Sequence, residues 1–480
     1  MKHLALLLLF ASCTRHIGGA KVTDAGRDEN PAATDGSLAV ADGAVVENVD
    51  AAVPPTIDAT VVPDAVGSCS QNSECSGSLP ICDMNACRAC AMSSDCAFDV
   101  AHPVCAQSGN LAGACVECTT SSDCQSKQMA CDVAHNVCAA CEKNEECSTG
   151  LCSAAICALA ATQVYVDGSA HCIGADGSYD KPFCTISEGL NQAMIPGSPH
   201  VVVVRSGSYS DILTVTSGAV AQLTLIGLSQ PTLTANGVSP AVTVQSSGPA
   251  LDLTIDNFVL TGARGHTLAC SGYADAPGKT KLTLQRSTVQ NGAKIGINSS
   301  NCTLRLDRDV IKNNGGGGIY LSTTDFTLTN LLVVGNGTTT TSFGGITVPL
   351  QATTSLIFNL TIVNNSARNS AYGGITSSEA LAATGIVLFG NGGMAEHDNN
   401  FSPFACAFVG ANSGSSIDLA GCHQGQIFKD SQFHLQTGAG ACVLVDKGHA
   451  PMSPPAQLSF DLDGNPRPVG AYDIGAYESQ

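Results

Sequence analysis

The sequence predicts an all-β chain whose largest part is a parallel β-helix, a solenoid in which each coil of short strands stacks on the previous coil. Three observations predict it. Aliphatic residues recur at an offset of 22 positions, Asn and Gly recur between them, and aromatic residues are scarce. With 5% aromatic residues, no Trp and 50 Gly, the composition suits thin aliphatic layers joined by tight turns better than a thick aromatic core.

Apolar ladders carry the 22-residue offset. The aligned sets are Leu282, Leu304 and Phe326; Leu284, Leu306 and Leu328; and Val289, Ile311 and Val333. Ile297 and Ile319 keep the same register, and Ile346 and Ile375 follow after insertions, which predict loops over 338–343 and 367–372. A fixed offset with strand alternation indicates coils whose strands lie about 4.8 Å apart, so that each ladder buries the one beneath it.

Asparagine and glycine mark the expected corners of the coils. They occur at Asn291-Gly292, Asn313-Asn314-Gly315, Asn336-Gly337, Asn364-Asn365 and Asn391-Gly392. Both residue types tolerate the left-handed backbone that a sharp corner needs. Stacked Asn side chains can also hydrogen-bond along the stack, so we interpret these residues as structural.

The two ends of this region carry a family resemblance. Thr185 to Glu188 forms a capping-box pattern that predicts a short amphipathic helix through Met194, followed by a buried strand over 201–204. This opening resembles the N-terminal cap of right-handed, single-stranded parallel β-helix proteins of the pectate-lyase-like class. The ending Asp-Ile-Gly-Ala-Tyr-Glu at 473–478 resembles the C-terminal signature of bacterial surface β-helix proteins of the choice-of-anchor type. The resemblance covers 165–480 and implies a β-helix domain over 161–480.

Sixteen cysteines between residues 69 and 160 form four sets of four, each opening with Cys-x5-Cys. The sets are Cys69, Cys75, Cys82 and Cys87; Cys90, Cys96, Cys105 and Cys115; Cys118, Cys124, Cys131 and Cys138; and Cys141, Cys147, Cys152 and Cys157. Units this small need crosslinks for stability, so we predict disulfides, with a cysteine-only zinc ribbon as the alternative. The pattern resembles the Dickkopf-type repeats of some secreted bacterial proteins, and it suits a spacer better than a binding stalk, because no Arg or aromatic anchor repeats with it.

The N-terminus predicts export. A basic start and a short apolar run over 4–10 have the length of a signal-peptide core. The run ends in Phe10-Ala11-Ser12-Cys13, which resembles the bacterial lipobox. The resemblance implies that residues 1–13 are a lipoprotein signal peptide with Cys13 as the lipidated residue, and that Thr14 directs the protein to the outer membrane. Residues 14–68 are acidic, lack aromatic residues and show no period, which predicts a disordered linker.

Seven cysteines remain outside the four sets and Cys13. We expect the pairs Cys172–Cys184, Cys270–Cys302 and Cys406–Cys422, which leaves Cys442 without a partner. An odd cysteine in an exported protein indicates either an intermolecular bond or a wrong pairing.

One dense charged patch provides the candidate catalytic residues, Asp307, Arg308 and Asp309, with Arg286 one coil earlier. On a strand, the two aspartates would face the same side about 6.5–7 Å apart. That separation suits a pair of acid/base carboxylates or a calcium ion beside a lyase arginine. The alternative is a solvated face whose charges pair across the stack and contribute little.

Other polar clusters give weaker signals. Asp167, Asp176 and Asp180 could hold calcium, but simple turn chemistry explains them as well, so we predict no metal site and no cofactor. The histidines His266, His397, His423 and His434 show no spacing that metals prefer. Tyr320, Phe343, Tyr372 and Phe389 are the candidate aromatic residues for stacking against a sugar ring.

These observations favour a surface lipoprotein that displays a non-catalytic β-helix with an adhesive, glycan-binding or structural role. The expected partners are the membrane, through the lipid anchor, and an extracellular polysaccharide or cell-surface glycan. The net charge of −19 argues against nucleic acid. The alternative is a polysaccharide lyase or hydrolase acting on acidic glycans, which the fold class allows and which would use the patch at Asp307 to Asp309.

Overall fold

The computed structural model describes residues 68–479 with gaps. The gaps are 142, 154–155, 217, 219, 238–239, 246–249, 273–279, 410–415, 439, 441, 449–458 and 469–470, and the side chains of 351–353 are also not described. The predicted signal peptide, Cys13 and all but the last residue of the predicted linker lie outside the described residues. Within the described residues, no helix has the length and apolar character needed to cross a bilayer.

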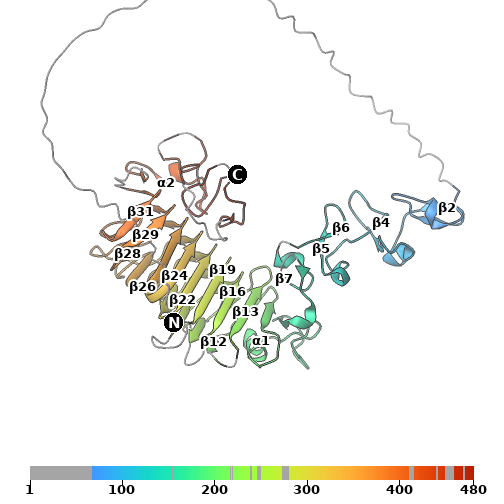
Figure 1. The fold of residues 1–480 in the computed structure, drawn as a ribbon, viewed down its shortest axis with the longest axis horizontal. Helices are drawn as coiled ribbons and strands as arrows, with labels where there is room; N and C mark the ends of the chain where they lie inside the picture. The colour runs from blue at the N-terminus through green and yellow to red at the C-terminus, as the bar shows by residue number, and fades with distance from the viewer. Residues whose placement is uncertain are drawn as a thin grey trace, which may run out of the picture. The chain divides into compact units, whose positions relative to one another are not determined.

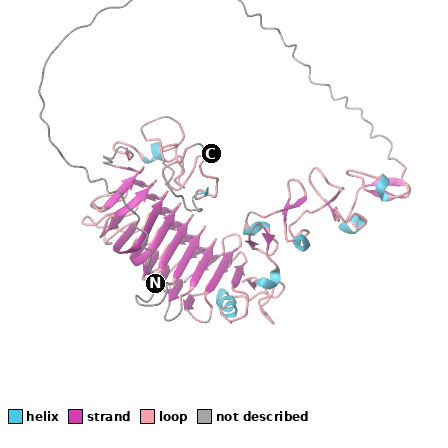
Figure 2. Cartoon of the chain, viewed as in Figure 1, coloured by secondary structure: helices cyan, strands magenta, loops and turns pink. Residues whose placement is uncertain are grey.

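The predicted parallel β-helix is confirmed, and it occupies the chain from β9 onward (Figures 1 and 2). Parallel pairing joins its strands into two large sheets. The first sheet contains β9 (Val164–Val166), β10 (Val201–Val204), β12 (Leu213–Thr216), β13 (Gln222–Gly227), β15 (Val242–Gln245), β16 (Asp252–Asp256), β18 (Leu268–Ser271), β19 (Lys281–Gln285), β21 (Ile297–Ser300), β22 (Thr303–Asp307), β24 (Ile319–Thr329), β26 (Ile346–Phe358), β28 (Ile375–Ser377), β29 (Leu381–Thr384) and β31 (Phe401–Phe404).

The second sheet forms another face of the coils. It contains β11 (Ser208–Tyr209), β14 (Thr232–Thr234), β17 (Val259–Thr261), β20 (Thr288–Gln290), β23 (Val310–Lys312), β25 (Leu332–Val334), β27 (Thr361–Val363), β30 (Val387–Phe389), β32 (Ala407–Phe408) and β33 (Ile417–Asp418). The long strand β24 pairs with both β21 and β22, so in that coil the first sheet continues unbroken from one face to the next.

The register is the one that the 22-residue offset predicts. Leu282 pairs with Leu304, which pairs with Phe326, and the Val289 ladder aligns in the same way. These side chains are buried in one apolar cluster that runs the length of the solenoid. Alternation within each short strand therefore sets both the coil and its stacking.

An asparagine ladder runs along one corner of the coils. Asn314, Asn336, Asn365 and Asn391 are buried. The Nδ2 of Asn314 donates to Oδ1 of Asn336 at 2.9 Å, and the same bond links Asn336 to Asn365 and Asn365 to Asn391 at 2.9 and 2.8 Å. The predicted hydrogen bonding along the stack is confirmed, and it satisfies backbone groups that the corners would otherwise bury unpaired.

The two ends of the solenoid are covered differently. At the N-terminal end lies α1 (Ile186–Ala193), which starts with the predicted capping box of Thr185 and Glu188 and buries Ile186 and Leu190. Near the other end, the C-terminal segment, defined as the described residues between 417 and 479, begins with β33 of the second sheet, then packs on the outer face of that sheet and includes α2 (Gln424–Ile427). Its apolar side chains cover Leu332, Val363 and Val387, so these outward positions are buried although they lie outside the coil.

The four cysteine modules share one disulfide pattern, in which the first cysteine bonds the third and the second bonds the fourth. The pairs are Cys69–Cys82, Cys75–Cys87, Cys90–Cys105, Cys96–Cys115, Cys118–Cys131, Cys124–Cys138, Cys141–Cys152 and Cys147–Cys157. The close groups of three sulfur atoms that could suit a metal are made of these bonded cysteines, so the structure has the predicted disulfides in place of a zinc ribbon.

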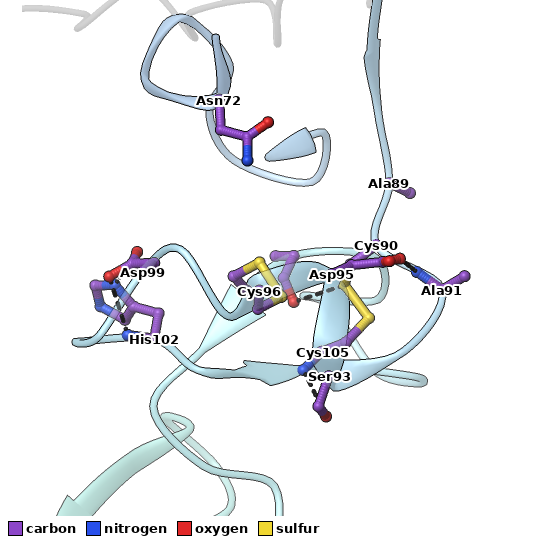
Figure 3. Close-up of a disulfide and its surroundings, with 12 residues drawn as sticks. Asn72, Ala89, Cys90, Ala91, Ser93, Asp95, Cys96, Asp99, His102 and Cys105 are labelled. Carbon is purple, nitrogen blue, oxygen red and sulfur yellow. Dashed lines mark hydrogen bonds and ion pairs between the residues drawn. A yellow bond between two sulfur atoms is a disulfide. The ribbon is translucent and has the colours of Figure 1, made fainter. Parts of the chain in front are cut away.

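Each module is a 3-10 turn followed by a small antiparallel pair. The elements are η1 (Asn72–Glu74), β1 (Ile81–Asp83) and β2 (Ala86–Arg88); η2 (Ser93–Cys96), β3 (Val104–Cys105) and β4 (Cys115–Val116); η3 (Gln125–Lys127), β5 (Ala130–Asp132) and β6 (Val137–Ala139); and η4 (Asn144–Glu146), β7 (Cys152–Ser153) and β8 (Ile156–Cys157), with η5 (Ala160–Thr162) next. The acidic residue before each second cysteine accepts a backbone hydrogen bond, as Asp95 does from Ala91 at 2.8 Å beside the Cys90–Cys105 bond (Figure 3).

The remaining disulfides correct one prediction. Cys172–Cys184 and Cys270–Cys302 form, but the predicted pair Cys406–Cys422 is wrong, because Cys422 bonds Cys442. Cys406 is free and fully buried in the interior of the solenoid, where burial raises the pKa of its thiol to about 11. Cys422 lies in the cluster outside the second sheet, so the wall of the coil separates the two sulfur atoms.

Candidate functional site

A stack of left-handed residues marks the corner where strands of the first sheet lead into the second sheet. Successive coils place Asn257, Arg286, Arg308 and Asn330 there, with φ of 64°, 53°, 57° and 53°. Asn tolerates this backbone readily, whereas the longer side chain of Arg adopts it at a cost. Two adjacent arginines in strained conformations are the kind of feature that points to a functional site.

Both arginines are ion-paired with buried carboxylates. Arg286 donates from Nε to Oδ1 of Asp256 at 2.8 Å and from Nη2 to Oδ2, and Arg308 donates from Nε to Oδ2 of Asp307 at 3.0 Å. The arginine side chains are 25% and 22% exposed, and the aspartates 4% and 3%. Burial acts to lower the pKa of Arg286, but the hydrogen bond to Asp256 and the nearby negative charges together outweigh it and the pKa is raised, so the guanidinium stays charged.

The predicted arrangement of Asp307 and Asp309 is wrong. Strand β22 ends at Asp307 and Arg308 turns the chain, so the two aspartates do not share one face of a strand. Asp307 accepts from Thr329 Oγ1 at 2.7 Å and Asn330 Nδ2 at 3.2 Å, while Asp309 accepts from the backbone N–H groups of Ser287 and Asp307. Both carboxylates support the corner from inside, and only Arg308 of the three predicted residues reaches the surface.

Asp309 makes stability depend on pH. Its side chain is fully buried, and this burial raises its pKa well above the usual value, with further help from the nearby charge of Asp307. A carboxyl group whose folded pKa exceeds the unfolded value of about 3.9 binds its proton more tightly in the folded state, so its contribution to stability falls as pH rises above that value.

We therefore expect Asp309→Asn to flatten the dependence of stability on pH. The backbone N–H groups of Ser287 and Asp307 bond to Oδ1 and Oδ2 separately, and Asn keeps only one of these acceptors, so the variant loses one bond at every pH. Because Asn does not titrate, the wild type should still lose stability relative to the variant as pH rises from about 4 to 7. Urea denaturation at several pH values measures the difference. A constant difference across this range would show that Asp309 does not titrate differently in the folded state.

The fourth cysteine module contacts this corner. Asn144 Nδ2 donates to Oδ2 of Asp256 at 3.3 Å, and Asn257 Nδ2 donates to Oε1 of Glu145 at 3.1 Å. Further along the module, the hydroxyl of Tyr165 donates to the carbonyl of Thr149 at 2.8 Å. Between the module and the first sheet lies a cavity of about 540 Å³, lined by Lys143, Asn144, Leu151, Cys152, Thr224, Ile226, Thr254, Asp256, Gln285, Arg286, Arg308, Phe460, Asp463 and Gly464.

The C-terminal segment forms the opposite wall. His434 joins two of its loops, with Nδ1 at 2.6 Å from Asp430 and Nε2 at 2.7 Å from Asp463. Phe460 is 44% exposed, and its ring lies 5.8 Å from the guanidinium carbon of Arg308. A second cavity of about 340 Å³ is lined by Gln230, Asn257, Arg286, Ser287, Thr288, Arg308, Val310, Gln432, His434, Leu462, Asp463, Gly464 and Tyr477.

The two cavities adjoin, because both are lined by Arg286, Arg308, Asp463 and Gly464. We call them together the corner groove. Three segments that are far apart in the sequence form it: the fourth cysteine module, the corner of the β-helix and the C-terminal segment. Of the sequence-predicted charged patch, Arg308 and Arg286 line this groove, whereas Asp307 and Asp309 do not.

The other predicted candidates lie elsewhere or serve the fold. Asp167 pairs with Arg205, and Asp176 accepts from the backbone of Ser178, which is turn chemistry. Phe343 is buried, and Phe389 packs against the C-terminal segment. Phe460 was missed because neither its neighbours nor its spacing distinguish it. His434 was considered only as a metal ligand, because its two carboxylate partners are 4 and 29 residues away and no spacing reveals them.

Comparison with known proteins adds little. No family model matches the chain, and no curated protein matches it. Among solved structures, the crystal structure of the pectate lyase Pel9A is similar, with 13% sequence identity and a TM-score of 0.34 over 66% of this chain and 96% of that chain. The fold is established by the strand pairing itself, and no functional residue is transferred from that enzyme.

The geometry of the corner groove suits binding better than acid/base catalysis. Asp256 and Asp307 are buried and ion-paired, Asp309 is fully buried, and Asp463 is paired with His434. A catalytic acid must reach the bond that it protonates, and Asp309, whose pKa is raised, has no exposed surface with which to do so. Partly exposed arginine N–H groups, an exposed phenyl ring and amide groups remain available for contact with a ligand.

Proposed function

We propose that this chain is a lipid-anchored bacterial surface protein whose β-helix binds a glycan chain in the corner groove without cleaving it. The observation that carries the proposal is the groove itself, in which ion-paired arginines lie beside an exposed aromatic ring. The arginines, held in place by their ion pairs, can hydrogen-bond to the hydroxyl groups of a sugar. The exposed phenyl ring can pack against the apolar face of a sugar ring.

The anchor and the cysteine modules support display at a surface. The lipobox-like sequence before Cys13 indicates membrane attachment, and extensive disulfide bonding suits an oxidising compartment outside the cytosol. Attachment through Cys13 to the outer membrane, with the β-helix facing outward, is part of the proposal. Loss of labelled fatty acid in a Cys13→Ala variant is the matching test of the anchor.

Binding of glycans by the full chain tests the proposal. The chain, purified in mild detergent, is titrated with a panel of neutral and acidic oligosaccharides by calorimetry. We expect at least one member to bind and Phe460→Ala to weaken it about tenfold, because an aromatic contact contributes about 1 kcal/mol beyond area burial.

Phe404→Ala is the matched control, since Phe404 is 49% exposed on β31 and does not line the groove. It should leave the affinity unchanged. An equal loss in the two variants would place the binding site outside the corner groove, and binding of no panel member would refute glycan binding.

A further inference from the structure

We infer that the ligand of the corner groove is an uncharged glycan chain rather than an acidic one. This inference rests on the proposed function and narrows it to one substrate class. Three observations support it. The charges around the groove are paired with one another, the ion pairs leave hydrogen-bonding groups available, and two cavities share Arg286 and Arg308 in their lining.

The positive charges of the groove are already balanced. Lys143, Arg286 and Arg308 are the lysine and arginine side chains that line it, and Asp256 and Asp463 are the lining carboxylates. Asp307 and Glu145 lie directly behind, bonded to Arg308 and Asn257. Three positive charges thus face four carboxylates, and His434, which is shared between Asp463 and a fifth carboxylate, Asp430, adds a positive charge only when protonated. A site for a polyanion would need an excess of positive charge, and neither the groove nor the chain, with a net charge of −19, supplies one.

A carboxylate on the ligand would also meet like charge. Oδ2 of Asp307 lies 3.0 Å from Nε of Arg308, so an anion that approaches this guanidinium also approaches the aspartate. Asp256 holds Arg286 through both Nε and Nη2 in the same way. A hydroxyl group avoids this repulsion, because it can accept from a guanidinium N–H and donate to a neighbouring carboxylate or amide oxygen.

The shape of the groove indicates a chain rather than a single sugar. Its two cavities, of about 540 and 340 Å³, are both lined by Arg286 and Arg308, and each has the size of a small-molecule site. The ring of Phe460 lines the larger one beside Arg308. Consecutive sugar units can therefore occupy the two cavities, with the arginines at the junction.

Pairs of glycans that differ only in charge test the inference. The full chain in mild detergent is titrated with polygalacturonate and its methyl ester, and with carboxymethylated and unmodified cello-oligosaccharides, at about 50 and 300 mM salt. We expect the uncharged member of a pair to bind at least about tenfold more tightly, with an affinity that changes less than about twofold with salt, and Phe460→Ala to weaken this binding.

The other outcomes separate the two proposals. Tighter binding of the charged members, weakened strongly by salt, would overturn the inference and leave glycan binding in place. Binding of no charged or uncharged member, by the wild type at either salt concentration, would overturn both.

Discussion

Asn336→Ala is expected to lower the free energy of unfolding of the β-helix by about 4 kcal/mol. The side chain of Asn336 is fully buried in the asparagine ladder. Its Oδ1 accepts from the backbone N–H of Asn314 at 3.0 Å, and its Nδ2 donates to the carbonyl of Ile311 at 2.8 Å and to Asn365 Oδ1. Each buried polar group left unpaired costs about 1–3 kcal/mol, and Ala leaves several.

Urea denaturation of the full chain measures this loss. Asn298→Ala is the matched control, because Asn298 points outward from β21 and is only half-buried, so its replacement should cost less than about 1 kcal/mol. If the two variants lost similar amounts of stability, the ladder would contribute no more than a half-buried polar side chain does, and the stacked asparagines would need another explanation.

Arg467→Ala is expected to destabilise the packing of the C-terminal segment by about 3–5 kcal/mol. Arg467 and Glu478 form an ion pair whose side chains are both 0% exposed, with Nε 2.8 Å from Oε2. The guanidinium also donates to Asn330 Oδ1 and to the carbonyl of Gly475, both at 3.1 Å. Removing one partner leaves the carboxylate of Glu478 buried without its counter-charge.

Limited proteolysis of residues 417–479, together with denaturation, measures the effect of Arg467→Ala. Arg205→Ala is the control, because the ion pair of Arg205 with Asp167 is longer, at 3.2 Å, and its arginine is 30% exposed, so its loss should cost less than about 1 kcal/mol. Resistance of Arg467→Ala to proteolysis at the wild-type level would show that the apolar contacts of the segment hold it without the ion pair.

The C-terminal signature at 473–478 has a structural role, because its residues bond to the coil and pack against it. Gly475 donates its N–H to the carbonyl of Gly385 at 2.9 Å, and Ala476 donates to Thr361 Oγ1 at 3.0 Å. Ile474, Ala476 and Tyr477 are buried against the second sheet. In this structure the signature attaches the C-terminal segment to the outside of the coil, and thereby holds in place one wall of the corner groove.

The fold was largely predictable because it is encoded locally. Alternation within short strands, an offset of 22 residues and Asn at the corners each act within one coil or between adjacent coils. The capping box at Thr185 and the cysteine spacing act over even shorter distances. Each coil then repeats the structure of the coil before it, so the register of Leu282, Leu304 and Phe326 could be predicted without knowledge of tertiary contacts.

The site was less predictable because its parts meet only in three dimensions. Phe460, His434 and Lys143 come from segments that no sequence period connects with Arg308. The error at Asp309 has a local cause, since an arginine in a left-handed conformation at 308 ends the strand where alternation predicted its continuation. The error at Cys406 arose because sequence proximity to Cys422 does not reveal that the wall of the coil lies between them.

Assays for turnover of a bound glycan distinguish binding in the corner groove from cleavage there. The full chain is incubated with the neutral and acidic glycans of the panel, with and without calcium, and new reducing ends and unsaturated products are measured over time. We expect binding with no release of product. Product release that Asp307→Asn or Asp309→Asn abolishes, while the variant remains folded, would contradict it and identify a polysaccharide-degrading enzyme.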